Sequence, residues 1–240
     1  MQGNNQQAYD RGTSLFSPDG RIYQVEYARE AVNRGAPSLG LRTEEGVVLV
    51  AQSRAGSELM EAESIEKLHK LDDHVGAASA GHVADARKLI DYAREQAQVN
   101  RLRYDEPIGV ETLAKRITDN LQESTQRGGI RPFGAALLVG GVEDGEPHLF
   151  ETDPSGTPHE WQATAIGGNR GDLLEFLETE YDPELSLEEG VTLAVRALLQ
   201  VVEDLSAADV SVATVGVDEG YHDLTAEEKE SALERARSDE

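Results

Sequence analysis

The sequence predicts an α/β protein in which helices cover two β-sheets. Strand-like segments come first along the chain, two long helical segments follow, and the second half repeats this order of strands and then helices. Blocks of this kind bury their apolar faces when helices are layered on sheets. No linker rich in Pro, Ser or Gly divides the 240 residues, so we expect one large domain.

Strands are predicted from short apolar runs that are rich in β-branched residues and bounded by turn residues. Segment 47–51 is apolar at every position, which is typical of a strand buried on both faces. The predicted strands span residues 38–42, 47–51, 65–71, 75–79, 135–139, 147–151, 161–166 and 210–217.

Helices are predicted where apolar residues recur every three or four positions. Pro107 and Gly109 separate the first long helix from the second. The predicted helices span residues 83–103, 110–126, 172–180, 187–205 and 225–237.

The segment before the first strand predicts a turn followed by a helix. Pro18 suits the second position of a type I turn and Gly20 its fourth, so that Asp19 can cap a helix of about residues 20–34. We expect Gly35 to end this helix in the left-handed conformation. Its apolar stripe consists of Ile22, Val25, Ala28 and Val32. The pattern alone describes an ordinary amphipathic surface helix.

Acidic residues dominate the charged composition. Asp and Glu number 46 against 22 Lys and Arg, which gives a formal net charge of −24. Such a surface repels nucleic acid, and like charges at this density destabilise a compact fold in dilute buffer. At about 1 M salt the Debye length falls to about 3 Å, which screens most of the repulsion. We therefore expect a halophilic protein, and the alternative is an acidic protein from a mesophile.

Several classes of site are not supported by the sequence. The chain contains no cysteine, which excludes disulfides, thiolate metal sites and a cysteine nucleophile. His69, His74 and His82 lack metal-site spacing, so we expect no metal and no cofactor. Residues 1–8 are polar and no apolar run approaches the roughly 20 residues that span a bilayer. We therefore expect a cytoplasmic protein without membrane or nucleic-acid partners.

Three segments near the start resemble the N-terminal signature of proteasome α-type subunits. They are residues 9–13 (YDRGT), 16–21 (FSPDGR) and 24–32 (QVEYAREAV). Further α-subunit-like motifs follow in the family's order at residues 64–68 (SIEKL), 80–87 (AGHVADAR), 128–134 (GGIRPFG) and 153–156 (DPSG). The chain thereby resembles an archaeal 20S proteasome α-type subunit, of haloarchaeal character, over about residues 9–217.

The resemblance implies the four-layer α/β/β/α sandwich of N-terminal-nucleophile hydrolases, with an extra N-terminal helix. It divides the chain into a flexible gate tail at residues 1–12, a single subunit domain at residues 13–217, and an acidic C-terminal helix or tail at residues 218–240. The implied function is that of a non-catalytic subunit of the outer ring, which gates substrate entry in ATP-dependent protein degradation. It would nucleate assembly with β-subunits and dock an ATPase activator.

The implied partners are other α-subunits in a seven-membered ring, proteasome β-subunits, the proteasome-activating ATPase and the unfolded proteins that pass through. The resemblance assigns gate and hinge roles to Tyr9, Asp10, Arg11, Pro18 and Tyr27. It assigns an activator-docking pocket between neighbouring subunits to Lys67, Gly81, His82 and Val83. It assigns the loop that narrows the pore to Arg127, Gly128, Gly129 and Ile130.

Within the implied pocket, Lys67 would pair with the C-terminal carboxylate of the ATPase, for which a point-charge ammonium is well suited. Gly81 would let the partner's backbone approach closely. His82 is a departure, because archaeal members of the family often carry an aliphatic residue there. We therefore expect a more polar pocket than is usual in the family.

Catalytic β-type subunits share the implied fold, and the two types differ at the first strand. Catalysis needs a free N-terminal threonine assisted by a nearby lysine. Here Ala36 has no hydroxyl, Pro37 has no primary amine and Ser38 lies two residues further along. We therefore expect no catalytic residues in this chain. An active N-terminal-nucleophile hydrolase and an acidic scaffold module that shares only the fold stay open as alternatives.

The charge composition predicts a dependence of stability on salt. The free energy of unfolding should rise as KCl increases from about 0.1 M to about 3 M, because the screened carboxylates repel one another less. Urea unfolding followed by circular dichroism at each salt concentration measures the change. A flat response would contradict the halophile interpretation.

Overall fold

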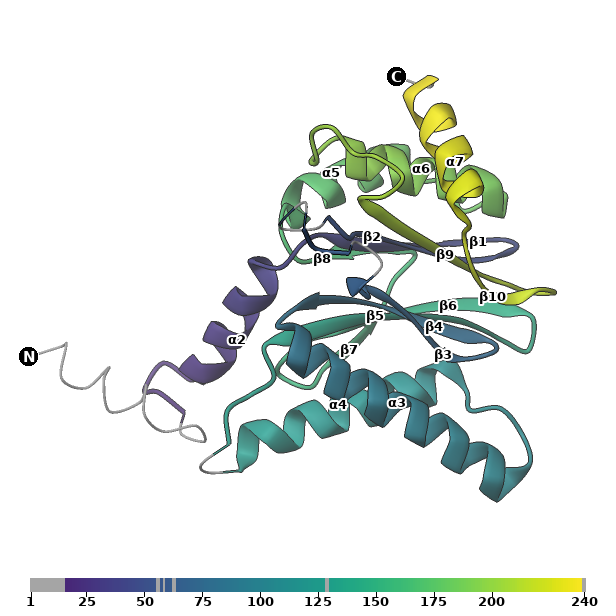
Figure 1. The fold of residues 1–240 in the computed structure, drawn as a ribbon. Coiled ribbons are helices and arrows are strands. Elements are labelled where there is room, and N and C mark those ends of the chain that lie inside the picture. The colour runs from purple at the N-terminus through teal and green to yellow at the C-terminus, as the bar shows by residue number, and fades with distance from the viewer. Residues whose placement is uncertain (1–15, 55–56, 58, 62–63, 128–129, 239–240) are drawn as a thin grey trace, which may run out of the picture.

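The computed structural model describes residues 16–54, 57, 59–61, 64–127 and 130–238. Two five-stranded antiparallel sheets lie face to face, and a layer of helices covers the outer face of each (Figure 1). This is the four-layer α/β/β/α arrangement that the resemblance implies. Between the two layers of helices, the chain places one apolar core inside the sandwich and one under each helical layer.

The two sheets are built mainly from hairpins. The first has the order β10-β9-β2-β1-β8, with β1 Ser38–Thr43, β2 Gly46–Gln52, β8 Ala163–Ile166, β9 Val210–Gly216 and β10 Gly220–Asp223. The second has the order β3-β4-β5-β6-β7, with β3 Leu68–Asp72, β4 Val75–Gly81, β5 Ala135–Glu143, β6 Glu146–Thr152 and β7 Pro158–Glu160.

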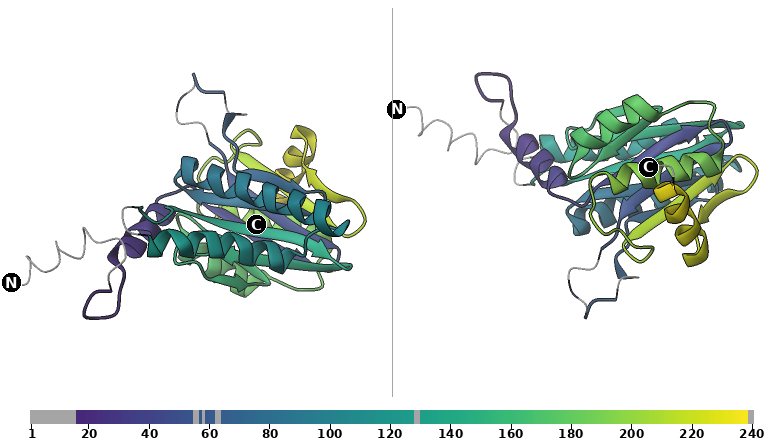
Figure 2. Two further views of the ribbon diagram at one scale, coloured as in Figure 1. Left: turned by 90° about the horizontal axis from the view of Figure 1, so that it is seen from below. Right: turned by 90° about the horizontal axis from the view of Figure 1, so that it is seen from above.

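The helices fall into two covering layers and one projecting element. The second sheet is covered by α3 Val83–Tyr104 and α4 Val110–Gln126, which lie side by side when the molecule is seen from below (Figure 2). The first sheet is covered by α5 Arg170–Glu180, α6 Leu187–Leu199 and α7 Ala226–Ser238. At one end of the sandwich, α2 Tyr23–Asn33 projects beyond both sheets (Figure 1).

β2 shows why the sequence contains continuous apolar runs. Val47 and Leu49 face the other sheet and pack with Leu149, whereas Val48 and Val50 face the helices of the first layer. Because β2 is central and covered on both faces, no position in it reaches solvent except at its end. The prediction of a strand buried on both faces is confirmed.

The predicted strand 161–166 begins two residues too early, because β8 starts at Ala163 and residues 161 and 162 form the crossing between the sheets. β7 pairs with β6 in the second sheet, whereas β8 pairs with β1 in the first. The crossing is held on both sides: Trp161 N donates to Leu149 O at 2.9 Å, and Arg42 N donates to Gln162 O at 2.8 Å. Apolar alternation identifies a strand but does not identify its neighbour, so it could not reveal this crossing.

Two expectations about the ends of α2 are also corrected. The turn at Pro18 forms, and Gly20 N donates to Ser17 O at 2.8 Å, but the helix begins only at Tyr23. Asp19 therefore does not cap it and instead accepts a hydrogen bond from Ser17 Oγ at 2.6 Å. Gly35 does not adopt positive φ. Glycine is required there because a Cβ would lie 2.4 Å from the backbone nitrogen of Gly81.

The predicted helix 187–205 is too long, since α6 ends at Leu199. Val202 and Leu205 stay buried in the turns that follow, which explains why the apolar spacing continued past the helix. No helix in the described ranges is long and apolar enough to cross a membrane.

The acidic C-terminal segment packs against the rest of the molecule. The sequence predicted a helix or tail after residue 217, and the structure forms β10 and α7 there. β10 extends the first sheet beside β9, and three side chains of α7 are buried on the same core, namely Ala232, Leu233 and Ala236. The sequence missed β10 because its four residues carry no apolar alternation.

Substitution of Leu233 tests whether α7 is part of the packed domain. Leu233 is 3% exposed, so Leu233→Ala should lower the free energy of unfolding by about 2–5 kcal/mol. Leu102→Ala is the matched control, because Leu102 lies on α3 but is 86% exposed, and it should change stability by less than about 0.5 kcal/mol. Urea unfolding at high KCl measures both. Equal effects would contradict the packing of α7.

Candidate functional site

Three of the four predicted docking residues line one cavity. It has a volume of 450 Å³ and lies between the segment before β3, the end of β4 and the first turns of α3. Lys67, Gly81 and Val83 all contribute to its wall. His82 is not among the lining residues; its side chain is 58% exposed and its Nδ1 lies 3.8 Å from Asp85 Oδ1. The cavity wall therefore lacks the imidazole that the sequence suggested.

Lys67 is held in place by its backbone and leaves its ammonium available. Its carbonyl accepts a hydrogen bond from Ser79 N at 3.0 Å, which fixes the residue beside β4. The side chain is partly buried, and burial lowers the pKa of Lys67 below its usual value. Within the described ranges, no carboxylate forms an ion pair with Lys67 Nζ. A partly buried ammonium with no carboxylate partner among the described residues favours an anionic ligand.

The cavity is cationic although the chain is strongly acidic. Lys67, Arg87 and Arg94 line it, against the carboxylates of Glu66 and Asp91. The first turns of α3 add Val83, Ala86 and Ile90 as an apolar wall. The cavity also faces the N-terminus of α3, whose N-cap makes no side-chain capping bond and which carries partial positive charge. Such a site suits a segment that ends in a carboxylate and carries an apolar side chain.

A second lining residue, His69, contributes no charge at neutral pH. Its side chain is buried, and burial, followed by the charge of Arg94, lowers the pKa of His69. Its Nε2 lies 3.4 Å from Ser79 Oγ. The positive charges that line the cavity are therefore those of Lys67, Arg87 and Arg94, of which Arg87 lies 4.0 Å from Asp91, and the end of α3 adds partial positive charge.

Gly81 shapes the rim of the cavity. It has a φ of +100°, and a Cβ there would lie 2.3 Å from the carbonyl oxygen of Gly134. The next residue, His82, donates its backbone N–H to the same oxygen at 2.8 Å. Only glycine allows this close approach at positive φ without strain.

The predicted gate residues lie on or before α2. Tyr9, Asp10 and Arg11 are outside the described residues. Pro18 occupies the turn that leads into α2, and Tyr27 lies on the helix with half of its surface exposed. Both therefore belong to the element that projects from the sandwich (Figure 2).

An ion pair that the sequence reasoning missed fixes α2 to the second sheet. Arg29 donates from Nε and Nη2 to the two oxygens of Asp153, both at 2.9 Å. Burial alone would raise the pKa of Asp153, but hydrogen bonds from Arg29 and Ser155 outweigh it and lower that pKa. Both partners lie in motifs that carried the resemblance. Their pairing could not be read from the sequence, because 124 positions separate them.

The predicted pore loop is described only at its ends. Arg127 follows α4 and pairs with Glu123 at 2.9 Å, and Ile130 is 47% exposed. Gly128 and Gly129 lie outside the described residues.

The first strand presents no accessible nucleophile among its hydroxyls. Ser38 is fully buried, and its Oγ donates to the backbone oxygen of Ser79 at 3.0 Å. Immediately upstream, Gly35 accepts a hydrogen bond from Gly168 N at 2.8 Å, which ties the chain into the fold.

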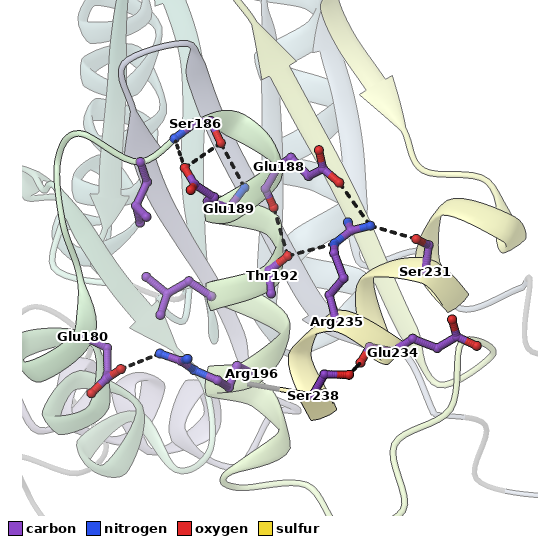
Figure 3. A pocket seen from close by; sticks show the side chains of 12 residues that line it. Glu180, Ser186, Glu188, Glu189, Thr192, Arg196, Ser231, Glu234, Arg235 and Ser238 are labelled. Atoms are coloured by element: carbon purple, nitrogen blue, oxygen red, sulfur yellow. Dashed lines mark hydrogen bonds and ion pairs between the residues drawn. The ribbon is translucent and has the colours of Figure 1, made fainter. Parts of the chain in front are cut away.

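A larger cavity of 690 Å³ lies among α5, α6 and α7, but both of its arginines already pair with carboxylates (Figure 3). Arg196 pairs with Glu180, and Arg235 pairs with Glu188 at 3.1 Å. Arg235 also donates to Thr192 Oγ1 at 3.2 Å. We therefore favour the Lys67 cavity as the functional site. In the described part of the chain, no group of three or more acidic or His side chains could hold a metal ion.

Two family models match this chain. The model for the N-terminal signature of A-type proteasome subunits matches residues 9–31, and the general model for proteasome subunits matches residues 32–215. The chain belongs to the proteasome α-subunit family. Its α2 is thus the helix of the α-type signature, and its sandwich is the fold that proteasome subunits share.

Similar proteasome α-subunits come from halophilic archaea. The chain is 64% identical to the proteasome α-subunit of Halobacterium salinarum over 237 residues, which cover 98% of this chain and 94% of the relative. It is 63% identical to the proteasome α-subunit of Natronomonas pharaonis over 238 residues, covering 98% and 93%. It is 64% identical to proteasome α-subunit 2 of Haloarcula marismortui over 229 residues, covering 95% and 94%.

These findings confirm the resemblance read from the motifs and support the halophile interpretation of the charge. As a proteasome α-subunit, the chain is a component of the proteasome peptidase complex and assembles with other proteasome subunits. An unrelated acidic scaffold is not supported.

Substitution of Gly81 tests how the rim of the cavity is built. Gly81→Ala should lower the free energy of unfolding by at least about 1 kcal/mol more than Gly145→Ala, because only Gly81 has backbone within contact distance of a new Cβ. Gly145 is the matched control, since its φ of +84° imposes a similar conformational penalty in open space. Thermal unfolding in high salt compares the two. Similar losses would show that φ alone requires the glycine.

Proposed function

We propose that this α-subunit is a non-catalytic ring component that docks the C-terminal carboxylate of an ATPase activator in the Lys67 cavity and gates substrate entry. The observation that carries the proposal is the cationic cavity in a chain of net charge −24. Acidic side chains outnumber basic ones in the chain by about two to one, so most of the surface repels an anion. A site in which cations outnumber carboxylates attracts one and therefore selects an anionic partner.

The cavity suits a terminal carboxylate better than a bulky anion. One ammonium, that of Lys67, stands without a described carboxylate partner at a rim formed by the glycine backbone. The apolar wall from Val83 to Ile90 can accept a side chain next to that terminus. Recognition of a chain end by backbone and a single cation is a recurrent mode of peptide binding.

The first strand supports a non-catalytic role. A threonine-type hydrolase of this fold needs a free N-terminal nucleophile. In this chain Ser38 is buried and bonded to a carbonyl, and the residues before it run through Gly35 into α2. The hydroxyl is therefore neither terminal nor accessible to a substrate, and active hydrolysis by the chain itself is the less favoured alternative.

The gate would consist of residues 1–12 and the approach to α2. α2 projects from the sandwich, and two aromatic side chains, Phe16 before the helix and Tyr27 on it, are 69% and 50% exposed. Exposed aromatic side chains at a projecting element support contacts with neighbouring α-subunits, here in a seven-membered ring. β-subunits would complete the core that receives unfolded proteins, in the cytoplasm.

Loss of the Lys67 ammonium should strongly reduce activator-dependent degradation. In cores assembled with β-subunits and the ATPase, Lys67→Ala should still form rings but lose about tenfold or more of the stimulated protein degradation, because a charge-assisted hydrogen bond is removed. Lys70→Ala is the matched control, since Lys70 lies in the adjoining strand but is exposed and paired with Asp73. Unchanged stimulation by Lys67→Ala would reject the docking site.

The lowered pKa of Lys67 predicts how docking depends on pH. Burial disfavours the ammonium, so Lys67 loses its proton at a lower pH than an ordinary lysine, whereas carboxylate binding requires the proton. Affinity for a peptide with the ATPase C-terminus should therefore be constant near pH 7 and fall as pH rises towards about 10. In Lys67→Arg the guanidinium stays charged, so its affinity should be flat. Parallel profiles would contradict the assignment.

A further inference from the structure

The rim of the Lys67 cavity is joined to the segment 131–134 by a compact set of contacts. Gly134 accepts the backbone N–H of His82 through its carbonyl oxygen at 2.8 Å. In return, Gly134 donates its own N–H to Asp85 Oδ2 at 2.9 Å. Because hydrogen bonds run in both directions, the rim and this segment must move together.

An ion pair between Asp85 and Arg131 adds to the contacts between the cavity rim and residues 131–134. Arg131 donates from Nη2 to Asp85 Oδ1 at 2.9 Å and from Nη1 to Asp85 Oδ2 at 2.5 Å. The carboxylate of Asp85 is 8% exposed, and it lies in the first turn of α3, two residues after Val83 of the cavity wall. Burial would raise the pKa of Asp85, but the bonds from Arg131 and Gly134 lower it, so the pair stays ionised.

The same contacts support the end of α2. Gly35, just after α2, lies so close to the backbone of Gly81 that a Cβ would come within 2.4 Å of Gly81 N. Ala31 Cβ, on the last turn of α2, lies 3.3 Å from the position that a Cβ of Gly134 would occupy. Helix α2 therefore packs closely on the ends of β4 and β5, and a displacement of Gly81 or Gly134 reaches the end of α2 through these contacts.

We propose that Asp85 and Arg131 are positioning residues that transmit occupation of the Lys67 cavity to α2, and through it to the gate. The inference rests on the docking and gating function proposed above. A ligand that contacts Val83 displaces the first turn of α3, which carries Asp85. The bidentate pair then moves Arg131 and Gly134 with it, and the end of α2 follows because it lies beside Gly134 and Gly81.

The pair can be removed without leaving a fully buried, unpartnered charge. The Arg131 side chain is 58% exposed, so water can solvate its guanidinium when Asp85 becomes Asn. Asp85→Asn also keeps an oxygen that can accept the N–H of Gly134. A matched control exists on the same helix: Arg101 donates to both oxygens of Asp72 at 3.2 Å, and Asp72 is 5% exposed. That pair lies at the opposite end of α3 from the cavity.

The test separates binding from opening. Assembled cores carrying Asp85→Asn, Arg131→Gln or Asp72→Asn are compared with the unsubstituted core for two quantities. The first is the affinity for a synthetic peptide with the C-terminal sequence of the activating ATPase. The second is the peptide hydrolysis that this ATPase stimulates. Cores that lack residues 2–12 provide the open-gate reference.

We expect Asp85→Asn and Arg131→Gln to bind the peptide within about twofold of the unsubstituted core but to lose about tenfold of the stimulated hydrolysis, a typical size for coupling between sites. Asp72→Asn should change neither quantity. Combining Asp85→Asn with the deletion should restore hydrolysis to the open-gate level, because that gate no longer needs a signal. Arg131→Lys should recover part of the stimulation, since it keeps the charge but not the bidentate geometry.

Three results would overturn the inference: full stimulation in Asp85→Asn, loss of peptide binding in proportion to loss of stimulation, or an equal loss in Asp72→Asn. Failure of the proposed docking function looks different. In that case the unsubstituted core and Lys67→Ala would bind the peptide equally weakly, and the inference would be rejected together with the docking site.

Discussion

The backbone of Gly81 lies against Gly35 and Gly134 only because neither Gly35 nor Gly81 has a Cβ atom. At this point α2, the first and second sheets and the N-terminus of α3 come together, so the close contact fixes the position of each. The Lys67 cavity owes its rim to Gly81, and α2 owes its direction of exit from the sandwich to Gly35. A side chain at Gly35 or Gly81 would clash with backbone and push these elements apart.

Charged side chains stabilise these glycine contacts only through interactions at short range. In concentrated salt the Debye length is about 3 Å, so long-range repulsion and steering are largely lost while contacts between charged groups persist. The pairs that matter in the structure are direct and bidentate: Arg29 with Asp153 and Arg131 with Asp85. Each joins elements distant in sequence around the glycine contact. An acidic surface and specific ion pairs are therefore compatible, because they act over different distances.

The sequence predicted the layers better than their connections. The spacing of apolar residues and the order of the segments were sufficient to predict β2, whose apolar run fits a central strand. They were also sufficient to predict the long helices α3 and α4. They were insufficient where the chain crosses from β7 to β8, because the partners β6 and β1 are set by packing of the whole domain. The resemblance, and not any spacing rule, singled out Lys67 and Gly81. The pairing of Asp85 with Arg131 was not predicted, since both are ordinary charged residues until the fold places them together.

The positions of Lys67 and Ser38 fit the proposed function, in which this chain docks an activator and does not catalyse. Ser79 lies between them: its carbonyl oxygen accepts from Ser38 Oγ at 3.0 Å, and its N–H donates to the carbonyl of Lys67 at 3.0 Å. A lysine in this neighbourhood would assist a free nucleophile in a hydrolase of the same fold. Here the hydroxyl of Ser38 is buried and the chain continues upstream into α2. The ammonium of Lys67 therefore has no free N-terminal nucleophile beside it to activate. It lines a cavity at the surface instead, and in the proposed function its charge binds a ligand from another chain.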